Sequence, residues 1–172
     1  IIKKNFIIDK FVFLPAGKIL FKDLKKINVK DLNKELNLQL ISLFKLVQGL
    51  EENFKKGSSI VIMGSDAAVG KPPPKMMIYS LIKSTLISLA KNLSVEFSEK
   101  NIRVNCISPG IIDTKLTKDI PEIVKEFYKV NSLTGKLTTS QDVVNLTLYL
   151  LSEKAKNITG ANLNLNGGYS ID

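Results

Sequence analysis

The sequence contains no histidine and no tryptophan, and it has one cysteine (Cys106) and one arginine (Arg103) among 172 residues. Without histidine, a Ser-His-Asp triad, a Cys-His pair and the commonest metal ligand are all excluded. A lone cysteine excludes a disulfide framework and a cysteine-rich zinc site, so we expect no metal, a cytoplasmic location and a small core residue at Cys106. No apolar run approaches the roughly 18 residues that a membrane span requires, and we see no signal-peptide pattern, so we expect no membrane partner.

The net charge of +9 comes almost entirely from lysine, since 25 basic residues stand against 16 acidic ones. A protein that recognises nucleic acid usually clusters its positive charge and uses arginine for bidentate base contacts. Here the lysines are scattered, and aromatic residues do not alternate with them regularly. We therefore expect a solvated, lysine-rich surface and no nucleic-acid partner; nucleic-acid binding through the net charge is the less favoured alternative.

Short apolar runs alternate with helical patterns along the chain. The runs that we interpret as buried strands cover residues 9–14, 59–63, 102–107 and 162–166. Apolar residues at spacings of three and four predict helices over residues 31–54 and 77–98, and shorter ones near residues 121–130 and 140–151. Residues 55–57, two lysines and a glycine, are expected to end the first helix. The alternation predicts parallel strands with right-handed crossovers, an α/β, doubly wound, Rossmann-like sheet in a single domain.

The turns after the first three predicted strands are the expected ligand site, because ligands of such sheets bind outside the carboxyl ends of the strands. These turns lie at residues 15–17, 64–65 and 108–110. Each contains a glycine, which lets the backbone turn sharply or approach a ligand closely. Three consecutive prolines within residues 72–74 predict a rigid loop beside this site.

Tyr79 and Lys83 stand four residues apart at the start of a predicted helix, so their side chains lie on one face. Ser65 lies in the turn after the preceding strand. The pKa of free tyrosine is about 10, so acid–base catalysis by tyrosine near pH 7 requires a pKa that is lower by about three units. Such a change corresponds to about 4 kcal/mol of phenolate stabilisation. An exposed ion pair supplies only about 0.2–1 kcal/mol. The site must therefore be partly desolvated and hold a second positive charge, such as that of an oxidised nicotinamide ring.

An ordered series of motifs resembles the short-chain dehydrogenase/reductase family. It comprises Ser65, Tyr79-x-x-x-Lys83, Asn-Ile-Arg-Val-Asn at 101–105, Pro109-Gly110 with Thr114 four residues on, and Thr159-Gly160 leading to Asn-Gly-Gly at 166–168. Tyr-x-x-x-Lys alone is a weak signal, but the ordered series covers about residues 9–172. The resemblance implies an NAD(P)-dependent oxidoreductase that interconverts a carbonyl and an alcohol. A 3-oxoacyl group on an acyl carrier, a sugar, a steroid and a small ketone all fit as substrate.

The resemblance also implies a role for each matching residue. Tyr79 would be the general acid/base, Lys83 would lower its pKa and hold the nicotinamide ribose, and Ser65 would polarise the carbonyl. NAD or NADP would contact Tyr79, Lys83, Leu14, Ala16, Gly17, Pro109, Gly110, Ile112 and Thr114. The expected partners are a small-molecule carbonyl or alcohol and further copies of the chain, in a homodimer or homotetramer formed through the two long helices.

Two positions depart from the pattern of the family. The turn that is usually Asn-Asn-Ala-Gly is here Leu-Pro-Ala-Gly at residues 14–17. Gln39 stands where the family usually has an asparagine that supports a proton relay to the lysine. Gln39 is therefore a fourth candidate catalytic residue. Its interpretation is open between a working relay, a degraded function and an ordinary position on the helix surface.

The glycine-rich phosphate loop of the family, Thr-Gly-x-x-x-Gly-x-Gly, has no counterpart upstream of Asp9. The units that would hold it amount to about 60–80 residues, at roughly 30 per strand-helix-strand unit. We therefore expect residues 1–172 to form a partial Rossmann-type domain, the C-terminal portion of a longer enzyme, with natural truncation as the main alternative. The alternative function is that of a truncated, non-catalytic relative that serves as an assembly partner or pseudoenzyme.

Overall fold

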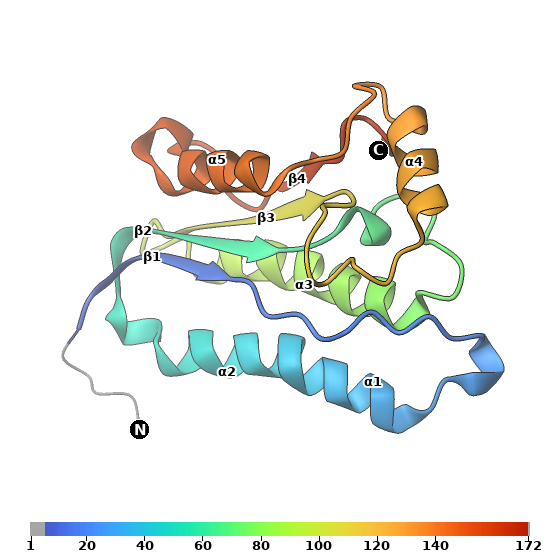
Figure 1. Ribbon diagram of the computed structural model, residues 1–172. Coiled ribbons are helices and arrows are strands. Elements are labelled where there is room, and N and C mark those ends of the chain that lie inside the picture. The colour runs from blue at the N-terminus through green and yellow to red at the C-terminus, as the bar shows by residue number, and fades with distance from the viewer. Residues whose placement is uncertain (1–5, 172) are drawn as a thin grey trace.

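Four parallel strands form one sheet at the centre of the molecule (Figure 1). In the computed structural model, which describes residues 6–171, the sheet order follows the chain order: β1 (Ile8–Phe13), β2 (Phe54–Met63), β3 (Arg103–Pro109) and β4 (Asn162–Leu165). Every neighbouring pair is parallel. Parallel neighbours require a crossover between them, which the helical segments of the sequence supply. The predicted α/β, doubly wound, Rossmann-like sheet is confirmed.

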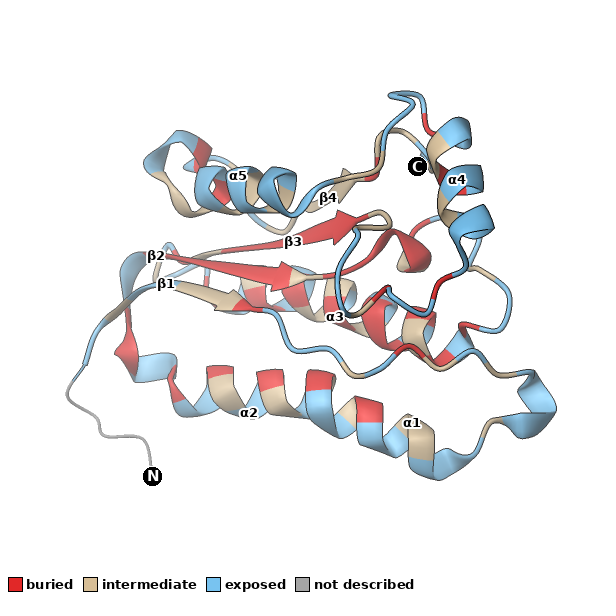
Figure 2. Ribbon diagram, in the orientation of Figure 1, coloured by how far each residue is buried: buried red, intermediate tan, exposed pale blue. Residues whose placement is uncertain are grey.

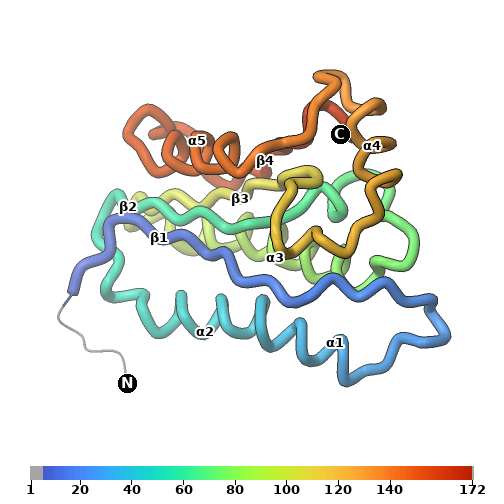
Figure 3. The backbone as a smooth tube through the Cα atoms, in the orientation of Figure 1, coloured from blue at the N-terminus to red at the C-terminus, as the bar shows by residue number. Residues whose placement is uncertain are grey.

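Helices cover both faces of this sheet (Figures 1 and 3). On one face, α1 (Val29–Glu35), a π-helical segment (Leu36–Ile41) and α2 (Ser42–Gly49) follow one another as a rod beside α3 (Met77–Glu96). On the other face lies α5 (Ser140–Leu151), while α4 (Glu122–Asn131) stands at the carboxyl ends of the strands. No helix within residues 6–171 combines the length and apolar character that crossing a membrane requires.

The strands β2 and β3 are buried on both sides (Figure 2). Ile60 and Ile62 pack into the larger apolar cluster with α2 and α3, whereas Val61 between them packs into a second cluster that contains Leu150 of α5. Successive side chains of a strand point to opposite faces, so a strand covered on both faces needs a continuous apolar run. Cys106 is fully buried in the larger cluster, which confirms its interpretation as a core residue.

The largest error in the predicted elements lies between the first helix and the second strand. A short 3-10 turn covers Glu51–Asn53, and β2 begins at Phe54, which we predicted as the end of the helix. Residues 55–57 therefore lie inside the strand and do not end a helix. The Phe54 ring packs edge-on against Phe11, with centroids 5.9 Å apart, and lies 5.8 Å from the ring of Phe97. These contacts join residues far apart in the chain, so the local spacing of apolar residues did not reveal them.

The other predicted boundaries agree with the structure within two residues, and α5 matches its prediction. β3 continues through Ser108 and Pro109, where we expected the strand to stop. Pro109 is paired with Leu165 at the end of the ladder, a position where a missing N–H group is tolerated.

The rod formed by α1 and α2 turns polar side chains towards the sheet in its first half. Leu36 and Leu40, two of the apolar residues of this segment, are only partly buried. Glu35 and Gln39 are buried instead, with 7% and 1% of their surface exposed. The π-helical segment Leu36–Ile41 widens the turn here and shifts which residues face inward. The interpretation of Gln39 as an ordinary helix-surface residue is therefore wrong.

Candidate active site

The turn after β2 brings Ser65 to the carboxyl end of the sheet. A Cβ at Gly64 would come within 2.7 Å of the Ser108 Oγ and 2.9 Å of the Cys106 Sγ, so a larger residue here would require β3 to shift. Ser65 then caps a 3-10 turn, Asp66–Ala68, in which its Oγ accepts a backbone N–H at 3.3 Å. The hydroxyl of Ser65 is thus held at the predicted place, and only 9% of the residue is exposed.

Tyr79 lies in the first turn of α3, and its side chain lines the same cavity as Ser65. Burial raises the pKa of the Tyr79 phenol, and the nearby Ser65 side chain lowers it by a smaller amount. A phenol in this setting stays protonated until further positive charge stabilises the phenolate. The cavity that Ser65 and Tyr79 line has a volume of about 70 Å³ and is shared with Ile19, Met76, Gly110, Thr117 and Tyr128 among others.

Lys83 lies one helical turn after Tyr79, as the spacing predicts, and is only 2% exposed. Its Nζ donates a hydrogen bond to the Met63 carbonyl at 2.9 Å and lies 5.8 Å from the centroid of the Tyr79 ring. Burial lowers the pKa of Lys83 to about 8, and the neighbouring Cys106 and Glu35 oppose that fall. The structure therefore brings Ser65, Tyr79 and Lys83 together at one edge of the sheet.

Glu35 is a buried acid beside this group that the sequence analysis missed. The Gln39 Nε2 donates a hydrogen bond to the Glu35 Oε2 at 2.9 Å, while the Gln39 Oε1 is buried without a hydrogen-bond partner in the described part of the chain. The spacing of four residues between Glu35 and Gln39 was the available signal, because it places both on one helix face. Leaving a buried carbonyl unpaired costs about 1–3 kcal/mol, so this polar pair is held at a cost in stability.

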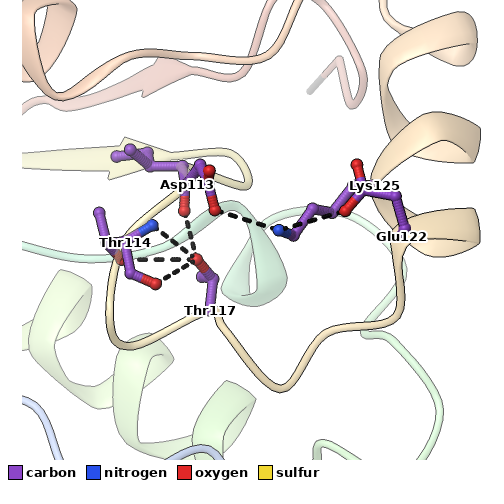
Figure 4. Close-up of polar contacts among 6 residues, drawn as sticks. Asp113, Thr114, Thr117, Glu122 and Lys125 are labelled. Carbon is purple, nitrogen blue, oxygen red and sulfur yellow. Dashed lines mark hydrogen bonds and ion pairs between the residues drawn. The ribbon is translucent and has the colours of Figure 1, made fainter.

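The loop after β3 is held in shape by the side chain of Thr117 (Figure 4). The Thr117 hydroxyl donates to the Ile112 carbonyl and accepts the Thr114 N–H at 3.1 Å. Lys125 ties the same loop to α4 through Asp113 at 3.0 Å. Ile112 is partly buried and Thr114 is exposed. Thr117 was missed by the sequence analysis, since a threonine in a loop carries no distinctive pattern.

Gly110 begins this loop and packs against Tyr128, where an added Cβ would overlap the phenol ring. Its N–H donates to the Leu165 carbonyl at 3.0 Å, which fixes the backbone at the rim of the cavity. Pro109, just before it, is fully within the buried end of β3 and also lines the cavity. The two predicted residues of this turn therefore lie beside Tyr79.

The turn after β1 is less directly connected to Tyr79 and Lys83 than the other two turns are. Leu14 and Ala16 are exposed, and within residues 6–171 no hydrogen bond or ion pair joins them to Tyr79 or Lys83. Gly17 lies directly against Glu35, because an added Cβ would overlap the Glu35 carboxyl group. Glycine at this position therefore makes room for the buried acid.

A second buried acid, Asp66, ties three distant segments together behind Ser65. Its carboxylate accepts hydrogen bonds from the Tyr128 hydroxyl at 3.0 Å, from the Asn166 Nδ2 at 2.6 Å and from the Ser170 hydroxyl. The Tyr128 ring stacks on Tyr169 with a centroid distance of 3.8 Å. Burial first, and then Asp66, raise the pKa of Tyr128 far above its usual value, so Tyr128 acts as a hydrogen-bond donor. The sequence analysis missed this cluster.

Sequence comparison with known proteins points to one family of enzymes. Residues 5–170 match a family model described as enoyl-(acyl carrier protein) reductase. The dehydrogenase/reductase SDR family member 6 of Danio rerio is 26% identical over 168 residues, covering 93% of this chain and 69% of the relative. The 3-oxoacyl-[acyl-carrier-protein] reductase FabG of Chlamydia trachomatis is 30% identical over 146 residues, 84% of this chain and 59% of the relative.

Solved structures agree with both the fold and the family. A short-chain dehydrogenase family protein from Francisella tularensis has a TM-score of 0.86 at 29% identity, covering 96% of this chain and 72% of that protein. The 4-hydroxyisoleucine dehydrogenase complexed with NADH has a TM-score of 0.84 at 28% identity, covering 94% of this chain and 68% of that protein. With a family model matched along nearly its whole length, and relatives of one kind in sequence and structure, the chain belongs to the short-chain dehydrogenase/reductase family of oxidoreductases.

Proposed function

We propose that this chain carries the catalytic centre of an NAD(P)-dependent oxidoreductase that interconverts a carbonyl and an alcohol. The observation that supports this most is the grouping of Ser65, Tyr79 and Lys83 at one edge of the sheet, where Ser65 and Tyr79 line a cavity. The phenol lines the same cavity as the serine, and the Lys83 ammonium lies 5.8 Å from the centroid of the phenol ring. A desolvated phenol with an ammonium at this distance is what acid–base chemistry by tyrosine requires.

In this proposal Tyr79 moves the proton. In reduction its hydroxyl donates a proton to the substrate oxygen and becomes a phenolate; in oxidation the phenolate takes the proton from the alcohol. Ser65 donates a hydrogen bond to the same substrate oxygen, where negative charge develops. Lys83, buried and so weakly screened by water, stabilises the phenolate more than an exposed lysine would.

The donors at this edge of the sheet suit the nicotinamide end of a dinucleotide. When bound, NAD or NADP supplies or accepts the hydride. The Lys83 ammonium has three donors for ribose hydroxyls and the Met63 carbonyl. The nicotinamide carboxamide would contact the Ile112 backbone and Thr114. The wall of the cofactor-binding site would be formed by Leu14, Ala16, Gly17, Pro109 and Gly110.

The substrate in this proposal is a small carbonyl compound or the corresponding alcohol. Relatives of the chain include the 3-oxoacyl-[acyl-carrier-protein] reductases and an NADH-dependent L-xylulose reductase from Ambrosiozyma monospora, 36% identical over 121 residues. A 3-oxoacyl thioester and a ketose are therefore the first two substrates to test.

Replacing Tyr79 by phenylalanine in the full polypeptide tests the mechanism. Loss of a general acid/base should lower kcat by about 10²–10⁴-fold, measured as oxidation of NADH or NADPH with each test substrate. Tyr149→Phe, at a half-exposed tyrosine on α5, is the matched control and should retain activity. Full turnover by Tyr79→Phe would eliminate the proposed role.

The alternative is a non-catalytic relative that acts as an assembly partner. Two departures from the family pattern favour it: Leu14-Pro15 in the first turn and Gln39 in the rod of α1 and α2. Titration with NADH and NADPH, followed by the fluorescence of the reduced nicotinamide, distinguishes the two functions. Tight, saturable binding would eliminate the non-catalytic alternative.

We further propose that the chain acts in the cytoplasm as a homodimer or homotetramer. Apolar side chains lie exposed on the two long helices, among them Phe44, which is 50% exposed, and Leu81, which is 44% exposed. Phe44 also lines a surface groove of about 390 Å³ between α2 and α3. A second copy packing here would remove this apolar surface from water.

A further inference from the structure

A buried carboxyl group follows Ser65 directly in the chain, and the proposed reaction does not use it. Asp66 is 8% exposed, although aspartate is almost never fully buried unless it is paired. Its hydrogen-bond donors are uncharged groups: the Tyr128 hydroxyl at 3.0 Å, the Asn166 Nδ2 at 2.6 Å and the Ser170 hydroxyl. Hydrogen bonds to an ionised group are roughly twice as strong as those between neutral groups, so these contacts constrain Asp66 tightly.

The turn that carries Ser65 is a single hydrogen-bonded unit. The Ser65 Oγ accepts the Ala67 N–H at 3.3 Å, and the Ser65 carbonyl accepts the Ala68 N–H at 3.0 Å. The Val69 N–H donates to the Asp66 carbonyl at 2.9 Å. Because these bonds close over so few residues, a displacement of Asp66 also displaces the serine hydroxyl.

The segment that binds Asp66 from the C-terminal side, residues 166–170, is itself held in one shape. Asn166 is 3% exposed, and its Nδ2 also donates to the Ser170 carbonyl at 2.9 Å. The Asn166 Oδ1 accepts the Gly168 N–H at 2.9 Å. Asp66 therefore attaches the turn of Ser65 to a segment that is already closed by its own hydrogen bonds.

Tyr128 connects the same carboxyl group to α4 and to the cavity. Its ring stacks on Tyr169 with a centroid distance of 3.8 Å, and its hydroxyl donates to Asp66. Tyr128 and Asp66 both line the cavity that contains Ser65 and Tyr79. The contacts of Asp66 thus run from α4 and residues 166–170 to the edge of the sheet where the reacting groups lie.

We propose that Asp66 is a positioning residue of this site, which holds the Ser65 hydroxyl in place by tying its turn to α4 and to residues 166–170. This rests on the proposed function, in which Ser65 donates a hydrogen bond to the substrate oxygen. A donor in such a role must be held in position before the reaction, because its stabilisation of developing charge depends on its not having to reorient. Asp66 acts through Ser65 and does not itself take part in the transfer of the proton.

A double-mutant cycle in the full polypeptide tests whether Asp66 acts through Ser65. Asp66→Ala should lower kcat by about 10²-fold, the loss that a misplacement of about 1 Å can cause. After Ser65→Ala there is no hydroxyl left to position, so adding Asp66→Ala should lower kcat by less than about twofold further. A merely structural role would lower kcat by the same factor in both backgrounds. Losses that multiply in this way would overturn the proposal.

Three further variants refine the cycle. Asp66→Asn keeps one acceptor oxygen and should recover part of the loss in kcat. Ser170→Ala removes one donor to Asp66, and should lower kcat by about 3–10-fold, but only while Ser65 is present. Ser152→Ala is the matched control at another partly buried serine, whose hydroxyl donates to the Tyr149 carbonyl at 2.7 Å, and should leave kcat unchanged. An unchanged kcat in both Asp66→Ala and Ser170→Ala would overturn the proposal.

Amide hydrogen exchange without substrate or cofactor covers the case in which Asp66→Ala does not fold. In Ser170→Ala the Val69 amide should exchange at least about tenfold faster than in the wild-type protein, while the Ile60 amide in β2 should be unchanged. Unchanged exchange at Val69 would overturn the proposal. Since exchange does not depend on turnover, its result is distinguishable from a failure of the proposed function, which the Tyr79→Phe kinetics report.

Discussion

Single residues of this chain take their chemistry from burial. Cys106 lies in β3, one of the two inner strands of the sheet, with none of its surface exposed, and burial raises the pKa of its thiol to about 11. Lys83 beside it is shifted in the opposite direction, to about 8, by the same physical cause. Desolvation disfavours the charged form of each group, and that form is an anion for cysteine and a cation for lysine. The sequence reveals both residue types but neither shift.

Cys106 should be unreactive in the folded chain. The thiolate is the nucleophile, and a pKa of about 11 leaves about one hundredth of the thiolate that an ordinary thiol has at pH 8. We therefore expect alkylation by iodoacetamide at pH 8 to be at least about 100-fold slower in the native protein than in urea, measured by mass spectrometry. Within this chain the added mass reports Cys106 alone. Equal rates in both states would contradict the buried placement.

Tyr128 should contribute to stability through its hydrogen bond with Asp66. Tyr128→Phe removes the hydroxyl and leaves Asp66 with its bonds from Asn166 and Ser170. We expect a loss of about 1.5 kcal/mol in the free energy of unfolding, the lower end of the range for a hydrogen bond to a charged group. Urea denaturation measures this loss, and Tyr149→Phe should change the same quantity by less than about 0.5 kcal/mol.

At the scale of elements, local signals determined some boundaries and distant contacts determined others. α5 begins where a threonine and an aspartate form a reciprocal cap: the Thr139 Oγ1 accepts the Asp142 N–H at 3.1 Å, and Asp142 accepts the Thr139 N–H at 2.8 Å. Such a cap is a property of four adjacent residues, and this helix was predicted at its observed limits. The start of β2 depends instead on the packing of Phe54 against Phe11 and Phe97, and it was predicted wrongly.

Thr139→Ala should weaken the start of α5. The substitution removes the acceptor of an N–H in the first turn, which has no partner within the helix. Losing such a cap typically lowers the free energy of unfolding by about 1 kcal/mol, so the Tm should fall by about 2–4 °C in a chain of this size. Ser140→Ala is the matched control, at the next and equally exposed residue. Differential scanning calorimetry compares the two variants. An equal Tm for both would contradict the role of the cap.

At the scale of the whole molecule, the two faces of the sheet differ in what they leave exposed. The rod of α1 and α2 lies beside α3 on one face, with the groove lined by Phe44 between α2 and α3, whereas α5 covers the other face (Figure 1). Apolar side chains are exposed on both faces, Phe44 on one and Leu148 on the other. Only the first lies in a groove between two long helices, which is why we propose it as the surface between copies of the chain.

Phe44→Glu should therefore dissociate the oligomer. Burying an unpaired charge in that interface costs more free energy than the apolar contact of Phe44 contributes to association. We expect sedimentation velocity at micromolar concentration to show a dimer or tetramer for the wild-type polypeptide and a monomer for Phe44→Glu. Leu148→Glu, the same kind of change at a side chain that is 61% exposed, should leave the oligomer intact. A monomeric wild-type protein would contradict the proposed assembly.

The sequence by itself determined the order of strands and helices, the parallel sheet, and the helical spacing that joins Tyr79 to Lys83, because these follow from periodicity, glycine-bearing turns and a four-residue interval. Only the tertiary structure decided that Glu35 and Gln39 face inward, that Asp66 binds three segments together, and that burial shifts the pKa of Lys83 to about 8. A local pattern specifies which side of an element is apolar. Desolvation and charge at a site depend on what other elements place there, and many of those partners are distant along the chain, such as Asn166, which lies 100 residues from Asp66.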